Sequence, residues 1–295
     1  MDIRVRKMNS SIHIIHVKGE MDMYNSHELK QQVLKMIENG VKGFILDLGD
    51  LQYIDSSGIS VLIFIYSTLQ KNKLRLWFVN VHGSVERVIE LTKLNQFFPI
   101  AGTLDDLLGQ FRKTSVVTEK QQKQEKTSPG IKVNSDSKLF DKTGMSAVEF
   151  PSDYQKIRYY TSLIVQKAPA EIKEVNILEQ QISEIIKNAI KHGNKKDKSK
   201  KVKVLFSFSK NHAHLIVSDK GKGFQQIDEW NRFYRKRSEC FTKRDFEEMQ
   251  KYLTFRTPNS DEQDGGNALF AAVEYWNEGV VFNDRRNSVA LRRSF

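Results

Sequence analysis

The segment Ser218-Asp-Lys-Gly-Lys-Gly-Phe224 combines a carboxylate with two glycines at the end of an expected strand. Asp219 could accept a hydrogen bond from an exocyclic amine, and Gly221 and Gly223 would let the backbone approach a ligand closely. Taken alone, this pattern is also typical of a plain turn. One hairpin earlier, Glu184 and Asn188 are four residues apart on an expected helix. The two motifs at this distance favour a ligand site over a chance turn.

On that helix, Lys191 follows Asn188 by three residues and so shares a stripe with Glu184 and Asn188. The opposite face carries isoleucines, which makes the helix amphipathic. A solvated polar stripe with no role in binding is therefore the alternative interpretation of the three side chains.

A second place for chemistry is Asp55-Ser56-Ser57-Gly58, where a loop leads into a helix. The first turn of a helix has unpaired backbone N–H groups and a dipole that favours negative charge. Phosphorylation of a serine there would add about −1.5 to −2 charge without melting the helix. The alternative is that Ser56 and Ser57 only cap the helix.

Local patterns predict the elements that position these motifs. Residues 2–8 and 11–17 alternate as a hairpin, with a turn at Asn9-Ser10, and Asn25 with Glu28 predicts a capped helix that ends at Gly40. Strands and helices then alternate, which indicates an α/β layer. In the second half, a long helix from Glu174 to His192, a hairpin over 202–219, a further helix and two terminal strands are expected.

Composition predicts a soluble globular protein of two domains within the 295 residues. The longest apolar stretch is too short for a membrane span, and the first residues lack the pattern of a secretory signal, so we expect a cytoplasmic location. The single cysteine, Cys240, excludes an internal disulfide and a multi-thiolate metal site. We predict a domain over residues 1–113, a flexible polar linker over 114–144, and a second domain over 145–295.

The first domain resembles the STAS-domain antagonists of anti-sigma factors. The resemblance rests on Gly19-Glu-Met-Asp22, on the strand ending Leu46-Asp-Leu48, and on Ile54-Asp-Ser-Ser-Gly-Ile59. It implies a mixed sheet with helices, a phosphoacceptor at Ser57, and a partner-binding surface shaped by Asp22, Asp55 and Ser56.

The second domain resembles the GHKL ATPases, most closely the anti-sigma-factor serine kinases, through the two motifs above and Gly265-Gly-Asn-Ala-Leu-Phe270. The resemblance implies a GHKL (Bergerat) ATPase α/β sandwich that binds ATP and Mg²⁺. It assigns Glu184 as the general base and Asn188 as the magnesium ligand. Its remaining assignments are Lys191 near the phosphates, Asp219 at the adenine amine, and Gly221, Gly223, Gly265 and Gly266 lining the nucleotide pocket.

Two features depart from the GHKL pattern. Ala268 stands where these proteins usually have a further glycine, and its Cβ could obstruct a phosphate or a positive φ. The segment between Gly223 and Gly265 is long and contains aromatic and basic residues, which suit a protein partner.

The sequence therefore predicts a partner-switching signalling regulator. In it, an ATP-dependent protein serine/threonine kinase domain is joined to a STAS domain that can be phosphorylated on Ser57. The alternative is a non-catalytic, degenerate ATPase scaffold that sequesters a protein. Expected partners are an anti-sigma factor, an antagonist or a sigma factor, with a phosphatase by analogy and a possible homodimer. The net charge of +11 and the lysines between 195 and 203 could attract nucleic acid, but a solvated loop accounts for them and no nucleic-acid motif is present.

Overall fold

The computed structural model describes residues 1–9, 11–112, 130–243, 245–257, 260 and 266–295. The chain divides into two compact units. Unit 1 comprises Met1–Thr127 and Arg244–Asn267, and unit 2 comprises Ser128–Lys243 and Ala268–Phe295. Among the described residues, no helix is long and apolar enough to cross a membrane.

Unit 1 is built on a mixed five-stranded sheet in the order β1-β2-β3-β5, with β4 also paired to β2. The β1–β2 hairpin is antiparallel, and the other pairs are parallel. Its strands are β1 (Asp2–Lys7), β2 (Ile12–Met21), β3 (Gly43–Asp47), β4 (Leu51–Ile54) and β5 (Arg75–Val79). The central strands are apolar on both faces, as expected for parallel strands that are covered on two sides.

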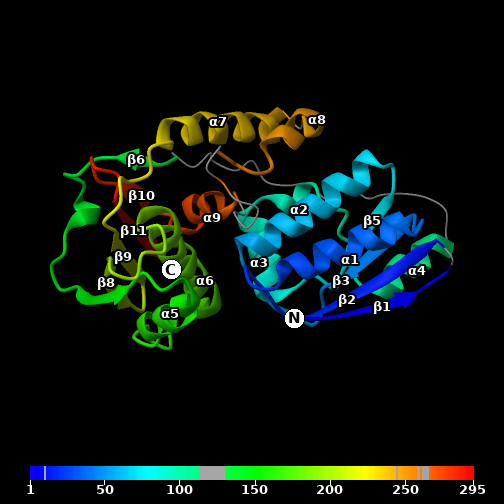
Figure 1. Cartoon of the computed structure of the whole chain (residues 1–295), viewed down its shortest axis with the longest axis horizontal. Helices are drawn as coiled ribbons and strands as arrows, with labels where there is room; N and C mark the ends of the chain where they lie inside the picture. Colours follow the sequence, from blue (N-terminus) through cyan, green and yellow to red (C-terminus); the bar gives the residue numbers. More distant parts are fainter. Residues whose placement is uncertain (10, 113–129, 244, 258–259, 261–265) are drawn as a thin grey trace. The chain divides into compact units, whose positions relative to one another are not determined.

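Helices of unit 1 bury both faces of this sheet (Figure 1). Leu107 packs on Ile14, Ile45 and Val79 at one face, whereas α2 lies beside α1 and against β4 and β5. The helical elements of this unit are α1 (Ser26–Glu38), α2 (Ser56–Lys71), α3 (Gly83–Leu91), η1 (Leu94–Gln96), α4 (Leu104–Arg112), α8 (Phe246–Met249) and η5 (Gln250–Tyr252).

Unit 2 has a six-stranded sheet in the order β6-β10-β11-β9-β8-β7, antiparallel except for the β6–β10 pair. Its strands are β6 (Lys132–Val133), β7 (Ser146–Pro151), β8 (Lys201–Ser209), β9 (His212–Ser218), β10 (Gly279–Phe282) and β11 (Ser288–Ser294). Leu205, Ile216 and Ala290 are in register on one face, where Leu139, Phe140 and Met145 cover them.

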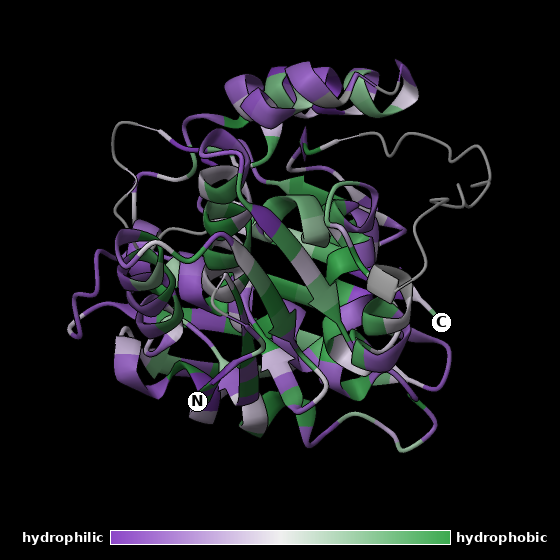
Figure 2. Ribbon diagram, turned by 90° about the vertical axis from the view of Figure 1, so that its right-hand side faces the viewer, coloured by the Kyte–Doolittle hydropathy of each residue, from purple (hydrophilic) through white to green (hydrophobic). Residues whose placement is uncertain are grey.

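The helical elements of unit 2 are η2 (Lys138–Phe140), η3 (Tyr154–Lys156), α5 (Ile157–Val165), α6 (Val175–Asn188), the π-turn η4 (Ala189–Gly193), α7 (Ile227–Lys243) and α9 (Ala268–Tyr275). α6 packs between α5 and α9. Trp230 and Tyr234 of α7 stack on Phe270 of α9, and the Arg237 guanidinium lies 4.4 Å from the centre of the same ring. Figure 2 shows hydrophobic residues concentrated on the strands and hydrophilic residues on the outer turns.

Three local expectations differ from the structure. β4 is an additional strand, since residues 51–54 are too few to show a periodic pattern. Residues 131–144, expected in the linker, belong to the second sheet and its cover, because β6 pairs with β10. The side chain of Asn25 does not cap α1. It bonds instead to the backbone of Glu20 and Asp22, at the end of β2.

Candidate functional site

The Asp55–Gly58 motif, predicted from the sequence to be the phosphoacceptor, lies at the edge of the unit 1 sheet where two parallel strands end. β2 and β4 pair in parallel, with Met21 opposite Ile54, so Asp22 and Asp55 follow their strands at the same edge. The Asp55 carboxylate accepts a hydrogen bond from the Met23 backbone N–H at 3.2 Å. The two aspartates singled out by the sequence are thus brought to one place.

Asp55, and neither serine, caps helix α2. One carboxylate oxygen of Asp55 accepts from the backbone N–H groups of Ser57 at 2.7 Å and of Gly58 at 3.0 Å. The interpretation that Ser56 and Ser57 serve as caps is therefore wrong, because both lie inside the first turn. The cap of α2 is therefore supplied by the Asp55 carboxylate.

The motif is tightly packed. Ser57 exposes 5% of its surface, and Asp22, Asp55 and Ser56 are also buried. A Cβ at Gly58 would lie 2.6 Å from the Ile54 side chain and 2.9 Å from the Met21 carbonyl oxygen. Glycine therefore lets α2 begin directly against the ends of β2 and β4.

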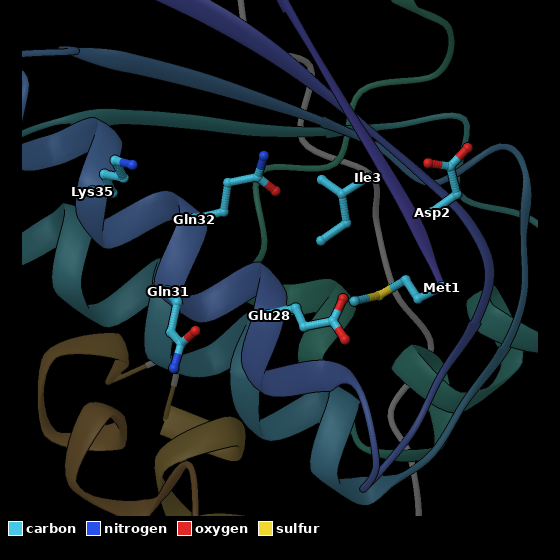
Figure 3. A pocket seen from close by; sticks show the side chains of 7 residues that line it. All are labelled: Met1, Asp2, Ile3, Glu28, Gln31, Gln32 and Lys35. Atoms are coloured by element: carbon cyan, nitrogen blue, oxygen red, sulfur yellow. The ribbon is translucent and has the colours of Figure 1, made fainter.

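Unit 1 also has an open groove of about 420 Å³, and none of the residues of the Asp55–Gly58 motif lines it (Figure 3). Asp2 and Ile3 of β1 and Glu28, Gln31 and Lys35 of α1 line it. It contains none of the residues that the sequence marks as functional, and its acidic and basic side chains select no one ligand class.

In unit 2, the polar stripe of the long helix is not solvated. Glu184 exposes 4% of its surface, Lys191 is also buried, and Asn188 is partly exposed. Glu184 Oε1 accepts a hydrogen bond from Lys187 Nζ at 2.8 Å. The interpretation as a solvated stripe is wrong, since a buried carboxylate and two buried ammonium groups are costly without a structural or chemical role.

Directly after Asn188 the helix widens into the π-turn η4, which contains Lys191. Single π-turns inside helices are rare and occur frequently at functional sites. The turn carries Gly193 to the strand end that bears Asp219. A Cβ at Gly193 would collide with the Asp219 carboxylate, and a Cβ at Gly221 would collide with the Gly193 carbonyl oxygen. The two motifs noted in the sequence are therefore in direct contact.

Asn194 fixes this contact and is a residue that sequence reasoning missed. It is fully buried, its Oδ1 accepts from the Lys220 backbone N–H at 2.7 Å, and its Nδ2 donates to Ser152 Oγ at 2.8 Å. Its charged neighbours make this part of the sequence look like a lysine-rich, solvated loop. A lone asparagine after a glycine at a helix end was the available signal.

Asp219 has one carboxylate oxygen engaged by the protein, and the other accepts no hydrogen bond from the described residues. Oδ1 accepts from the Gly221 backbone N–H at 2.7 Å. Burial raises the pKa of Asp219, and the Gly221 hydrogen bond opposes that shift. Because the carboxylate is only partly exposed, a ligand N–H at Oδ2 would meet an acceptor with little competition from water.

The third glycine-containing segment is described in part. Gly265 lies outside the described residues. Gly266 has a φ of +66°, and a Cβ there would lie 2.6 Å from the Phe255 carbonyl oxygen. Ala268 is the first residue of α9 and does not have a positive φ. The left-handed backbone conformation in this segment is adopted by Gly266. Gly223 also has a positive φ, of +79°.

One family of known proteins matches the first part of unit 1. The STAS domain family matches residues 4–107. These residues therefore form a STAS domain of the kind found in anti-sigma factor antagonists.

Particular relatives share this part of the chain. An anti-sigma-B factor antagonist of Staphylococcus aureus strain NCTC 8325 is 26% identical over 86 residues, which are 29% of this chain and 80% of that protein. An anti-sigma factor antagonist of Bordetella bronchiseptica is 24% identical over 96 residues, 32% of this chain and 83% of that protein. A crystal structure of an antagonist from Mycobacterium paratuberculosis is 27% identical, covers 38% of this chain and 94% of that one, and has a TM-score of 0.35.

Proposed function

We propose that this chain is a single-chain regulator of partner-switching signalling. Its STAS domain receives a phosphate on Ser57, and residues 145–295 bind Mg-ATP and act as a serine kinase of the GHKL type. The observation that carries the proposal is the contact between Gly193, at the end of the Glu184–Asn188 helix, and Asp219. Each motif is weak by itself, and the contact between them supports the proposal of one shared site.

The chemistry follows from these residues. Asp219 Oδ2 would accept a hydrogen bond from the exocyclic amine of adenine, and Gly221 and Gly223 would let the base and sugar approach the backbone. Among the described residues, no three His, Cys, Asp or Glu side chains are grouped as a metal site would require. By the resemblance to GHKL ATPases, Asn188 would bind Mg²⁺ together with phosphate and water oxygens, which are ligands that this ion prefers. Lys191 would approach the phosphates, and Glu184 would take the proton of the serine hydroxyl as the γ-phosphoryl group passes to the hydroxyl oxygen and ADP leaves.

A second candidate, the non-catalytic scaffold, is favoured by one contact. Glu184 Oε1 accepts a hydrogen bond from Lys187 Nζ at 2.8 Å, so this oxygen is already engaged where a general base would have to meet the serine hydroxyl. In a scaffold, the same fold would bind a protein partner, with or without nucleotide. Ser57 would then be phosphorylated only by a separate kinase.

Isothermal calorimetry with Mg-ATP and labelling with radioactive Mg-ATP separate the two candidates. A kinase binds the nucleotide and transfers label to Ser57, and it loses the label in both Glu184→Ala and Ser57→Ala. A scaffold shows no transfer in any form of the protein. If no binding is detected at millimolar ATP, the nucleotide site itself is refuted.

The likeness of the STAS domain to anti-sigma factor antagonists supports a protein partner of the anti-sigma or sigma factor class. Such a switch needs a phosphatase to reset Ser57, and a homodimer through the ATPase half accords with the resemblance. The proposed location is the cytoplasm, where both ATP and these partners are found.

A further inference from the structure

The loop between β10 and β11, residues 283–287, bonds to both ends of the glycine motif that follows β9. At one end, the Asp219 N–H donates to the Asn287 carbonyl oxygen at 2.9 Å, and Asn287 Nδ2 donates to the Asp219 carbonyl oxygen at 3.2 Å. At the other end, the Phe224 N–H donates to the Arg286 carbonyl oxygen at 2.9 Å. The loop therefore fixes where the motif begins and where it ends.

Arg286 adopts a backbone conformation that its residue type disfavours. Its φ is +59°, in the left-handed region that glycine and asparagine tolerate best. The backbone of the hairpin loop alone would favour one of those two residues at this position. A left-handed residue of another type persists where its surroundings fix it, and such residues cluster at functional sites. The role of Arg286 must then come from its side chain.

The guanidinium of Arg286 holds the chain that joins the glycine motif to α7. Nη1 donates to the Gln225 carbonyl oxygen at 3.0 Å, and Nη2 lies 3.5 Å from Asp228 Oδ2 in the first turn of α7. The Asp228 side chain is 72% exposed, so this ion pair contributes little. The bond to the Gln225 carbonyl oxygen is the stronger anchor, because its donor is charged and the Arg286 side chain is only 26% exposed.

The anchored turn contains two glycines, Gly221 and Gly223. Glycine loses more conformational freedom on ordering than any other residue, so a loose turn would lower ligand affinity by the cost of ordering it. A Cβ at Gly223 would lie 2.7 Å from the Arg286 carbonyl oxygen, which shows how closely the turn lies against the loop. Gln225 Nε2 donates to the carbonyl oxygens of Lys222 and Gly223 and closes the turn. The anchor at Gln225 therefore acts on the whole turn.

We propose that Arg286 is a positioning residue of the proposed nucleotide site. By holding the chain at Gln225, it keeps Asp219 and Gly223 where the adenine and the ribose would meet them, and it touches no reacting atom itself. The proposal rests on the proposed function, since its ligand is the nucleotide assigned to that site.

Hydrogen exchange on the full-length chain without nucleotide tests the anchor. Arg286→Asn removes the guanidinium and keeps a residue type that tolerates a positive φ. We expect the amides of residues 221–226 to exchange roughly threefold to tenfold faster, the range of one lost hydrogen bond. Arg285→Asn is the matched control, because Arg285 is exposed and the change in charge is the same. It should leave these amides unchanged.

Calorimetry with Mg-ATP and thermal unfolding of the same variants test the role in binding. Arg286→Asn should bind Mg-ATP roughly threefold to tenfold more weakly, whereas Arg285→Asn should keep the affinity of the unaltered chain. The melting temperature of Arg286→Asn should not fall, because the relieved backbone strain offsets the lost hydrogen bond. A role in hairpin stability alone would lower the melting temperature and leave the affinity unchanged.

Unchanged exchange at residues 221–226 in Arg286→Asn would overturn the proposal. Normal Mg-ATP binding by the unaltered chain, with equal affinity in Arg286→Asn, would refute the positioning role alone. If the unaltered chain binds no Mg-ATP, the proposed function fails, and the role of Arg286 towards a nucleotide fails with it.

Discussion

The Asp55 carboxylate joins the start of helix α2 to the backbone of Met23, 32 residues earlier in the chain. The Met23 N–H donates to Oδ2 at 3.2 Å, while Oδ1 caps the helix through the Ser57 N–H at 2.7 Å. One buried side chain thus holds the phosphoacceptor turn and the turn before α1 in a fixed relation. A phosphate at Ser57 would act on a preorganised surface.

Asp55→Ala should destabilise the STAS domain by about 2 kcal/mol, because it removes a helix cap and a buried acceptor for a second N–H. Urea unfolding followed by circular dichroism measures the loss. Asp50→Ala is the control and should cost less than about 0.5 kcal/mol, since the Asp50 side chain is exposed. An equal loss in the two variants would contradict the assignment of the cap.

Gly193→Ala should destabilise unit 2 by about 1–3 kcal/mol, because the new methyl group would collide with the Asp219 carboxylate. The same substitution at Gly109, in α4, meets no atom within 4 Å. It should stabilise the chain by about 0.5–1 kcal/mol through helix propensity. Thermal unfolding of both variants measures the expected loss of stability in the first and the expected gain in the second. An unchanged stability in Gly193→Ala would show that the motifs are not in contact.

Asp219→Asn should make the fold more stable at neutral pH and weaken adenine binding. Burial raises the pKa of Asp219 in the folded protein above its ordinary value of 3.8, so the folded state binds the proton more tightly than the unfolded chain does. The contribution of this group to stability is therefore full below pH 3.8 and is lost as pH rises through the folded pKa. The variant should lack that part of the pH dependence in unfolding curves. Calorimetry should show weaker ATP binding, and unaltered affinity would exclude Asp219 as the adenine contact.

Transfer to Ser57 should occur within one chain. Joining the two halves in one polypeptide gives an effective concentration on the order of millimolar. The rate constant for labelling should then stay the same over a hundredfold dilution. A mixture of Glu184→Ala and Ser57→Ala chains permits transfer only between molecules, and it should label slowly and in proportion to concentration. A mixture that labels as fast as the unaltered chain would exclude transfer in cis.

The sequence predicted what strong local periodicity encodes. The β1–β2 hairpin, helix α2 after Asp55, and the β8–β9 hairpin that leads to Asp219 are confirmed, because apolar residues alternate or repeat clearly along each of them. The mixed α/β architecture of the first domain is confirmed as well.

Other features depend on distant partners and leave little local signal. β6 has two residues and forms only because β10 offers an edge. Asn25 fits the pattern of a helix cap, yet its side chain binds the Glu20 carbonyl because that group is near in the fold. Asn194 has the sequence surroundings of a loop residue. Only the fold brings the end of β9 next to it, where it accepts a hydrogen bond from the Lys220 N–H. The membership of Arg244–Asn267 in unit 1 is of the same kind.

The division of unit 1 into Met1–Thr127 and Arg244–Asn267 also bears on biosynthesis. Translation proceeds at about 5–20 residues per second, so the second piece leaves the ribosome roughly 6–25 s after the first is complete. During that interval the first piece of unit 1 would exist without the second. Unit 1 could therefore be completed only after most of the chain of unit 2 has been synthesised.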